Sequence, residues 1–244
     1  VRGTATSATD AAMPFTTDAV AAGITAPSGR ITGSGAALAV DPAQNDAFRL
    51  INRALSEGGT VRMQGARYVV SGVATLKLEG WATALGLRAE RVAADASSAS
   101  VRSRVALYQP LSPSMDAGWT QWLMDQFEFR YTVISDADVR VGDLGDRFDV
   151  ILFASDRAGT LTDGSARGRV PPAIEGGLGD AGVRALDAFV RGGGTLVALN
   201  QSALFAIDAL HLKVRNVVRG LQSKDFFASG SILEVASDPA HPVM

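Results

Sequence analysis

The pattern of hydrophobic and polar residues changes near residue 104. Beyond it, short continuous apolar runs alternate with segments in which apolar residues recur at helical spacing. A continuous run such as residues 149–154 is typical of a strand that is buried on both faces. Strands that alternate with helices indicate a parallel, doubly wound sheet. We expect strands at 105–108, 131–134, 149–154 and 196–199, and helices at 115–127, 181–191 and 201–210.

A smaller α+β unit is predicted before this sheet, over residues 37–100. Phe48, Ile51 and Leu55 lie at helical spacing, and Gly58 follows as a stop signal. Residues 93–100 are small and polar, as in an interdomain linker, and residues 1–36 predict a linker or irregular edge strands. In this unit we expect strands at 37–40, 60–63 and 68–73, and helices at 45–57 and 76–85.

Together these patterns predict an α/β protein. A flavodoxin-like, doubly wound, mainly parallel sheet over residues 101–244 follows the small α+β unit. The chain begins without a signal-peptide core, and it ends soon after a strand expected at 231–235, without a terminal helix. We therefore expect a piece of a longer protein, truncated at its C-terminal side.

Composition narrows the choice of partners and chemistry. With 47% hydrophobic and 20% charged residues, the chain is expected to be soluble and globular. The net charge of −2 gives no electrostatic reason to expect nucleic acid or an anionic membrane, and no apolar run is long enough to span a bilayer. The chain holds no cysteine and only two histidines, His211 and His241. No metal site, cofactor or thiol nucleophile is therefore predicted.

The junction between the strand at 196–199 and the following helix is the most informative local feature. A residue at such a junction projects from the carboxyl edge of the sheet, close to free amides of the helix. Here the junction carries Asn200, Gln201 and Ser202, and we favour helix capping over chemistry for them. Ligands of such sheets bind beyond the carboxyl ends of the strands. The candidate ligand-binding residues are Tyr108, Gln109, Ser155, Asn200, Gln201 and Ser202.

Several other features favour ordinary structural roles. Residues 177–182 fit the glycine pattern of a dinucleotide site, but no strand is expected directly before them, so a loop is favoured. The long loop 156–179 carries Arg157, Arg167, Arg169 and Glu175, which either contact a partner or acidic ligand or, as we favour, are simply solvated. For the remaining residues we expect core positions for Trp119 and Trp122, partial burial for His211, and solvated or capping roles for Asp136, Asp138, Asp143 and Asp146.

A family resemblance covers most of residues 35–244. Residues 104–244 resemble the glutamine-amidotransferase-like domain at the C-terminal side of certain bacterial zinc carboxypeptidase-like proteins. Residues 45–55 are similar to the stretch that joins the peptidase domain to that module. The stretches that carry the resemblance are 104–110, 115–122, 148–152, 176–179, 189–197 and 225–233.

The resemblance implies an upstream zinc peptidase domain as a partner in the same chain, and export to the periplasm or beyond. It also implies a Cys-His-Glu triad, and Asn200 stands where the family has its cysteine. Because an amide is no nucleophile, no catalytic residue is carried over. We expect a non-catalytic accessory domain that packs on or modulates the peptidase. The alternatives are a module that binds a small polar ligand or carbohydrate, and a hydrolase that uses Ser202 or Ser114.

Overall fold

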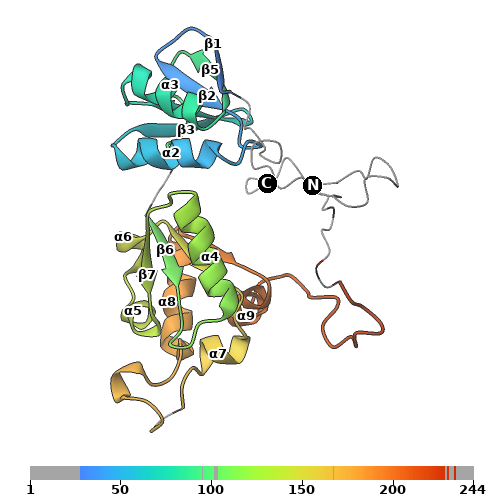
Figure 1. Ribbon diagram of the computed structural model, residues 1–244. Coiled ribbons are helices and arrows are strands. Elements are labelled where there is room, and N and C mark those ends of the chain that lie inside the picture. Colours follow the sequence, from blue (N-terminus) through green and yellow to red (C-terminus); the bar gives the residue numbers. More distant parts are fainter. Residues whose placement is uncertain are drawn as a thin grey trace, which may run out of the picture.

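The structure is a computed structural model that describes residues 28–94, 96–101, 104–166, 168–228, 230 and 234. Arg167, His241 and nearly all of the strand expected at 231–235 lie outside the described residues. The described chain contains two units, each built on its own sheet (Figure 1). Within the described ranges, no helix has both the length and the apolar character that crossing a bilayer requires.

The first unit is a mixed five-stranded sheet, sheet A, with two helices. Its strand order is β1-β5-β2-β4-β3, and only the β1–β5 pair is parallel. The sequence pattern did not predict β5, whereas the edge strand β1 agrees with the second of the two alternatives expected for residues 1–36, a linker or irregular edge strands. The elements are β1 (Arg30–Gly33), β2 (Ala37–Val40), α2 (Ala47–Ser56), β3 (Thr60–Gln64), β4 (Arg67–Ser71), α3 (Thr75–Ala84) and β5 (Arg88–Val92).

The helix α2 forms because its apolar residues share one face. Leu50, Ile51 and Ala54 are buried in the core of the first unit, together with Val70 of the sheet. The helix ends at Ser56, and Gly58 follows two residues later with a φ of +78°, a conformation that L side chains rarely adopt. This ending agrees with the stop signal in the sequence.

The second unit is a four-stranded parallel sheet, sheet B, with strand order β7-β6-β8-β9. The strands and main helices lie within two residues of the expected positions. The prediction of a mixed α/β protein with a mainly parallel sheet is confirmed. The elements are β6 (Val105–Tyr108), α4 (Met115–Gln126), β7 (Tyr131–Ile134), α5 (Asp136–Val141), α6 (Leu144–Arg147), β8 (Val150–Phe153), α7 (Ala158–Thr162), η2 (Pro172–Ile174), α8 (Gly179–Arg191), β9 (Thr195–Ala198) and α9 (Gln201–Ala209).

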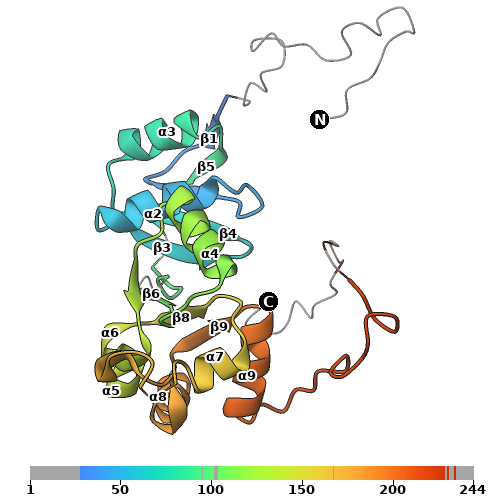
Figure 2. The same ribbon diagram turned by 60° about the horizontal axis from the view of Figure 1, so that its bottom comes forward.

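The main core of the second unit lies on one face of sheet B. Tyr108 and Phe153 are register partners on β6 and β8, and their rings meet edge to face with centroids 4.3 Å apart. Phe205 of α9 continues this stack, with its ring centroid 6.1 Å from that of Phe153. Leu186 of α8 joins the same cluster. Figure 2 shows α7 and α9 side by side at one end of this unit, where they are in contact.

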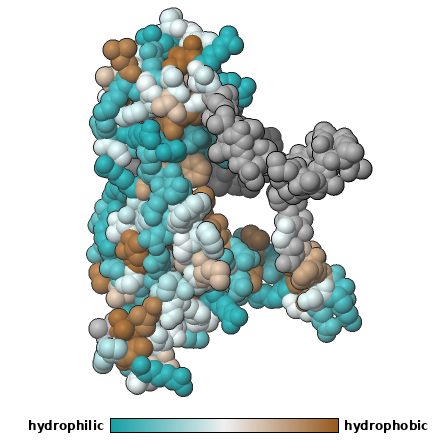
Figure 3. All heavy atoms as spheres, in the orientation of Figure 1, coloured by the Kyte–Doolittle hydropathy of each residue, from teal (hydrophilic) through white to brown (hydrophobic). Residues whose placement is uncertain are grey.

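The opposite face of sheet B is less completely covered. Leu107 of β6 is fully buried there, and α4 buries Ala117 and Met124. The side chains of Trp119 and Trp122 are 61% and 52% exposed, so the prediction that they belong to the core is wrong. The physical reason is helical phase: Ala117 and Met124 are seven residues apart and share the buried face, whereas both tryptophans lie across the helix from them. In the view of Figure 3, hydrophobic residues form separate patches on a mixed surface.

The loop 156–179 is more ordered than a solvated loop. It contains α7 and η2, an isolated β-bridge joins Ser165 to Gly176, and the carboxylate Oε1 of Glu175 accepts a hydrogen bond from the backbone N–H of Gly168 at 2.6 Å. Leu161 and Leu178 anchor it in the core. Because this loop, and not a strand, precedes Gly177, the glycine pattern at 177–182 lacks the context of a dinucleotide site.

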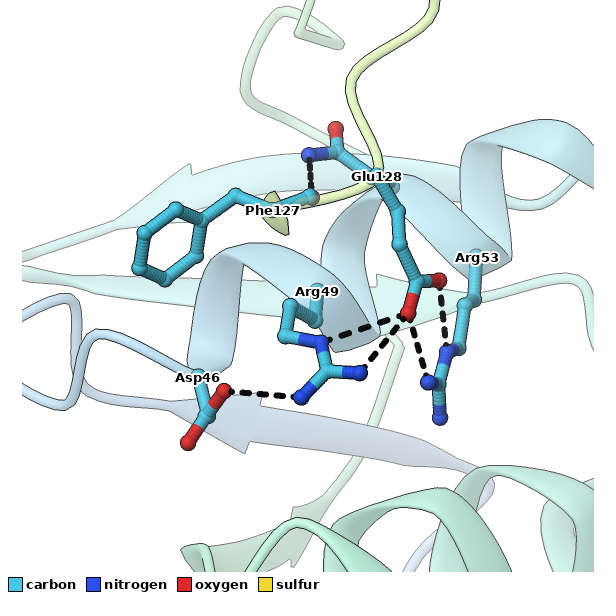
Figure 4. A network of polar contacts seen from close by, with 6 residues as sticks. Asp46, Arg49, Arg53, Phe127 and Glu128 are labelled. Atoms are coloured by element: carbon cyan, nitrogen blue, oxygen red, sulfur yellow. Dashed lines mark hydrogen bonds and ion pairs between the residues drawn. The ribbon is translucent and has the colours of Figure 1, made fainter. Parts of the chain in front are cut away.

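The two units contact one another through α2 and the turn that follows α4 (Figure 4). The guanidinium of Arg53 donates two hydrogen bonds to Glu128, and Arg49 donates a third at 3.2 Å. The amide Nδ2 of Asn52 donates to the backbone carbonyl of Phe127 at 2.8 Å. Two arginines, one carboxylate and one hydrogen bond from an amide to the backbone therefore hold α2 against the second unit.

Candidate functional site

A pocket of about 510 Å³ opens at the carboxyl edge of sheet B. It lies where the loop after β8 meets the N-terminus of α4, the helix α7 and the start of α9. This is the sheet edge at which ligands of parallel α/β folds bind. The lining residues are Ser112, Ser114, Met115, Asp116, Ser155, Asp156, Arg157, Thr160 and Gln201.

Asn200 lies between β9 and α9 in a strained backbone conformation. Its φ of +45° and ψ of −111° are rare for a residue with a side chain, and such conformations cost about 1–3 kcal/mol. Its amide Nδ2 donates to Ser155 Oγ at 3.0 Å, and its side chain makes no capping hydrogen bond to α9 within the described residues. The capping role expected for Asn200 is therefore wrong, because the amide points to the β8 loop and not to the helix N–H groups.

Ser202 lies beneath the pocket and is fully buried. Its hydroxyl donates to the carbonyl oxygen of Ala154 and accepts from the backbone N–H of Asp156 at 3.0 Å. These contacts fix the loop that follows β8. Ser202 thus positions the wall of the pocket, and the hydrogen bonds of its hydroxyl are to backbone groups.

Asp156 is the residue that sequence reasoning missed. It is only 5% exposed, and its carboxylate Oδ1 accepts from the backbone N–H of Ser114 at 3.2 Å. Burial raises the pKa of Asp156, and hydrogen bonds from the backbone and hydroxyl of Ser114 partly oppose this. The sequence could have indicated Asp156 as a candidate, because it closely follows the strand β8 and so lies at the same edge of the sheet as Asn200. Ser114 therefore has a carboxylate within reach, while it caps α4 by accepting from Ala117 N–H at 3.3 Å.

Tyr108 and Gln109 lie on the other side of this edge. Tyr108 is fully buried, and its hydroxyl donates to Asp136 Oδ1 at 2.5 Å. Burial raises the pKa of both groups. The hydrogen bond between them raises the pKa of the phenol further and lowers that of the Asp136 carboxyl, without cancelling the effect of burial on it. Gln109 donates to Gln121 Oε1 at 3.2 Å and lines a neighbouring pocket of about 430 Å³ together with Asp136. The structure thus brings Ser155, Asn200 and Gln201 together, with Ser202 below them, and places Tyr108 and Gln109 apart.

Two further expectations need correction. Asp136 is only 7% exposed and not solvated, because the first turn of α5 presses it against the Tyr108 hydroxyl. His211 is exposed and not partly buried, because the chain turns away from the core after α9 with a φ of +50° at that residue. Asp138 does cap α5, in a reciprocal capping box with Ser135.

Among the described residues, no group of histidine and carboxylate side chains is arranged to hold a metal ion.

Comparison with known proteins adds no relative to this picture. No protein-family model, curated protein or solved structure matches the chain. The family resemblance of residues 104–244 rests on the sequence stretches alone.

Proposed function

We propose that the second unit is a glutamine-amidotransferase-like domain without the nucleophile of that family, and that it binds a small polar ligand in the pocket beside Asn200. The backbone of Asn200 carries this proposal. A strained residue with a positive φ, directly between a strand of a parallel sheet and a helix, is the conformation of a nucleophile elbow. An amide at that position donates and accepts hydrogen bonds but attacks no carbonyl.

The topology of sheet B supports the same assignment. When the strands of sheet B are numbered by their order in the chain, they lie side by side in the order 2-1-3-4. The flavodoxin-like, doubly wound order begins in the same way. The pocket lies at the carboxyl ends of β6 and β8, between which this strand order reverses.

The lining of the pocket favours a ligand with several hydroxyl or amide groups. Ser112, Thr160 and Gln201 contribute groups that donate and accept hydrogen bonds. Arg157 adds one positive group, and Asp116 and Asp156 add two carboxyl groups. Such a mixed lining suits a carbohydrate or a short peptide better than a phosphate or a hydrocarbon.

A thermal-shift screen of the chain against mono- and oligosaccharides, amino acids and short peptides tests this proposal. A specific ligand raises the melting temperature by mass action. Gln201→Ala is expected to weaken binding about tenfold or more, since it removes a lining amide. Gln126→Ala, at the exposed far end of α4, is the matched control and leaves binding unchanged. If no compound in a broad panel shifts the melting temperature, or if both variants behave alike, the proposal fails.

We further propose that the chain acts as an accessory domain of a zinc carboxypeptidase-like protein. One observation favours this role: Met115, Trp119, Trp122 and Leu123 form an exposed apolar stripe on the outer face of α4. Aromatic residues and methionine are enriched in the cores of protein interfaces. Peptidase activity of the parent protein, with and without residues 37–244, tests it. Unchanged stability, kinetics and substrate range would rule it out.

A further inference from the structure

A second pocket lies between the two units, away from the carboxyl edge of sheet B. Its volume is about 250 Å³. On one side are α2 and β4 of the first unit, and on the other are the start of β6 and the residues after α4. Most of its wall is apolar, formed by Phe48, Ile51, Leu55, Tyr68, Val105 and Phe129. Neither the sequence patterns nor the proposed function accounts for this space.

At the edge of the pocket, Arg130 has no carboxylate partner among the described residues. Arg130 is exposed, lines the pocket and forms no ion pair with any residue that the structure describes. The neighbouring guanidiniums differ in this respect, since Arg49 and Arg53 share the carboxylate of Glu128. Among these described residues, the positive charge of Arg130 is thus in excess beside an apolar wall.

We propose that this pocket binds a small amphiphilic carboxylate, with its hydrocarbon part among the apolar side chains and its carboxylate at Arg130. Planar guanidinium groups match carboxylates in shape as well as in charge. At about 30 Å³ for each water-sized group, the pocket holds about eight such groups. An unbranched acid of eight carbons is therefore a suitable probe.

Binding there has a structural consequence. Phe48 and Ile51 belong to the first unit, whereas Phe129 and Arg130 belong to the second. A ligand in this pocket contacts both units and adds to the hydrogen bonds between Arg53 and Glu128. It is therefore expected to favour the arrangement of the two units that forms the pocket.

Isothermal titration with sodium octanoate tests the proposal. Butyrate, which fills less of the pocket, and 1-octanol, which carries no charge, are the comparison ligands. We expect octanoate to bind at least tenfold more tightly than either. Arg130→Gln is expected to weaken octanoate binding at least fivefold and to leave octanol binding unchanged. Arg184→Gln, which alters an exposed arginine on α8, is the matched control and binds octanoate as the unmodified chain does.

A second variant tests the pocket itself. Ser56→Phe places a ring at the polar part of the lining and is expected to weaken both octanoate and octanol. The melting temperature of each variant in the absence of ligand shows that it is folded. The proposal is overturned if no binding of octanoate is detected at 10 mM. A Kd at this limit is tenfold weaker than 1 mM, which is about 1.4 kcal/mol of binding free energy. It is also overturned if Arg130→Gln and the unmodified chain bind octanoate equally. Because Gln201 lies in the other pocket, these results are independent of the polar-ligand screen.

Discussion

Arg53 and Glu128 form a two-point ion pair across the boundary between the units, with Nε 2.7 Å from Oε2 and Nη2 2.6 Å from Oε1. The two residues are 75 positions apart in the chain. Glu128 lies directly after α4 with a φ of +59°, a conformation that turns the chain sharply after the helix. Figure 4 shows Arg49 and Arg53 converging on its carboxylate. One residue of the second unit thus organises two arginines of the first.

Glu128→Gln is expected to lower the free energy of unfolding by about 1 kcal/mol and to loosen the contact between the units. The change removes the charge from a carboxylate that is two-thirds buried between two guanidiniums, so the loss exceeds that of an exposed pair. Urea denaturation measures it. Glu90→Gln breaks the exposed pair with Arg67 and is the control, with an expected loss within about 0.5 kcal/mol. Equal losses for the two variants would contradict a special role for Glu128.

The same pair predicts a loss of stability in acid. The hydrogen bond from Arg53 is the largest cause that lowers the pKa of Glu128 below its ordinary value of 4.5. The stabilisation is therefore present above the pKa of the unfolded chain and is lost as the pH falls through the lower pKa of the folded chain. The stability difference between the unmodified chain and Glu128→Gln should shrink on acidification below pH of about 4. A difference that stays constant down to pH of about 2 would argue against the pair.

Tyr108→Phe is expected to destabilise the second unit by about 1–3 kcal/mol. The substitution keeps the ring in its contact with Phe153 but leaves the buried carboxylate of Asp136 without the hydroxyl that donates to it. Denaturation in urea measures the change, and Tyr131→Phe, which removes an exposed hydrogen bond to Asp125, is the control. A loss no larger than that of the control would show that the Tyr108 hydroxyl is dispensable.

The contribution of Asp136 to the free energy of unfolding is expected to depend on pH with the opposite sign to that of Glu128, and the variant Asp136→Asn tests this. Burial raises the pKa of Asp136 above its ordinary value of 3.8. The carboxyl group therefore contributes stability that is fully present below the unfolded pKa and is lost as the pH rises through the folded pKa. Because the amide does not titrate, the stability of the unmodified chain relative to Asp136→Asn should fall between pH of about 3 and 7. A rise over this range would contradict the direction of the shift.

Trp119→Gln and Trp122→Gln are expected to change the free energy of unfolding by no more than about 0.5 kcal/mol each, because both side chains are more than half exposed. Met124→Ala on the same helix is the buried comparison, with an expected loss of about 2–5 kcal/mol. Chemical denaturation distinguishes the two classes. If the tryptophan variants lowered the free energy of unfolding as much as Met124→Ala, the two rings would have to be buried in a core.

Local patterns predicted the elements of the fold well where one signal dominated. The continuous apolar run of β8 and the glycine stop after α2 each reflect a strong local constraint. The pattern failed for β5, Arg88–Val92, because three of its five residues are charged and its pairing with β1 and β2 is supplied by distant residues. It failed for the tryptophans of α4 because an apolar residue type does not by itself show which face of a helix is buried.

The sequence indicated the sheet edge at which the candidate pocket lies, but not the details of the pocket. The rule that ligands bind at carboxyl edges grouped Ser155, Asn200 and Gln201, and the structure places these residues close together. It could not show that Ser202 is covered, or that Asp156 lies inside the pocket, because both depend on how the chain turns after β8. Likewise, the burial of Asp136 follows from its contact with Tyr108, a residue 28 positions away.

The reactivity of a thiol introduced by Asn200→Cys tests the elbow at the carboxyl edge most directly. The natural sequence holds no cysteine, so any alkylation by iodoacetamide reports on the new thiol alone. Asn200 is exposed at the N-terminus of α9, where the positive end of the helix dipole lowers the pKa of a thiol. We expect its pKa to lie below the ordinary value of about 8.5, and its alkylation at neutral pH to be several times faster than that of the exposed control Ser223→Cys. A thiol with an ordinary pKa and the rate of the control would contradict the elbow and, with it, the proposed family of this domain.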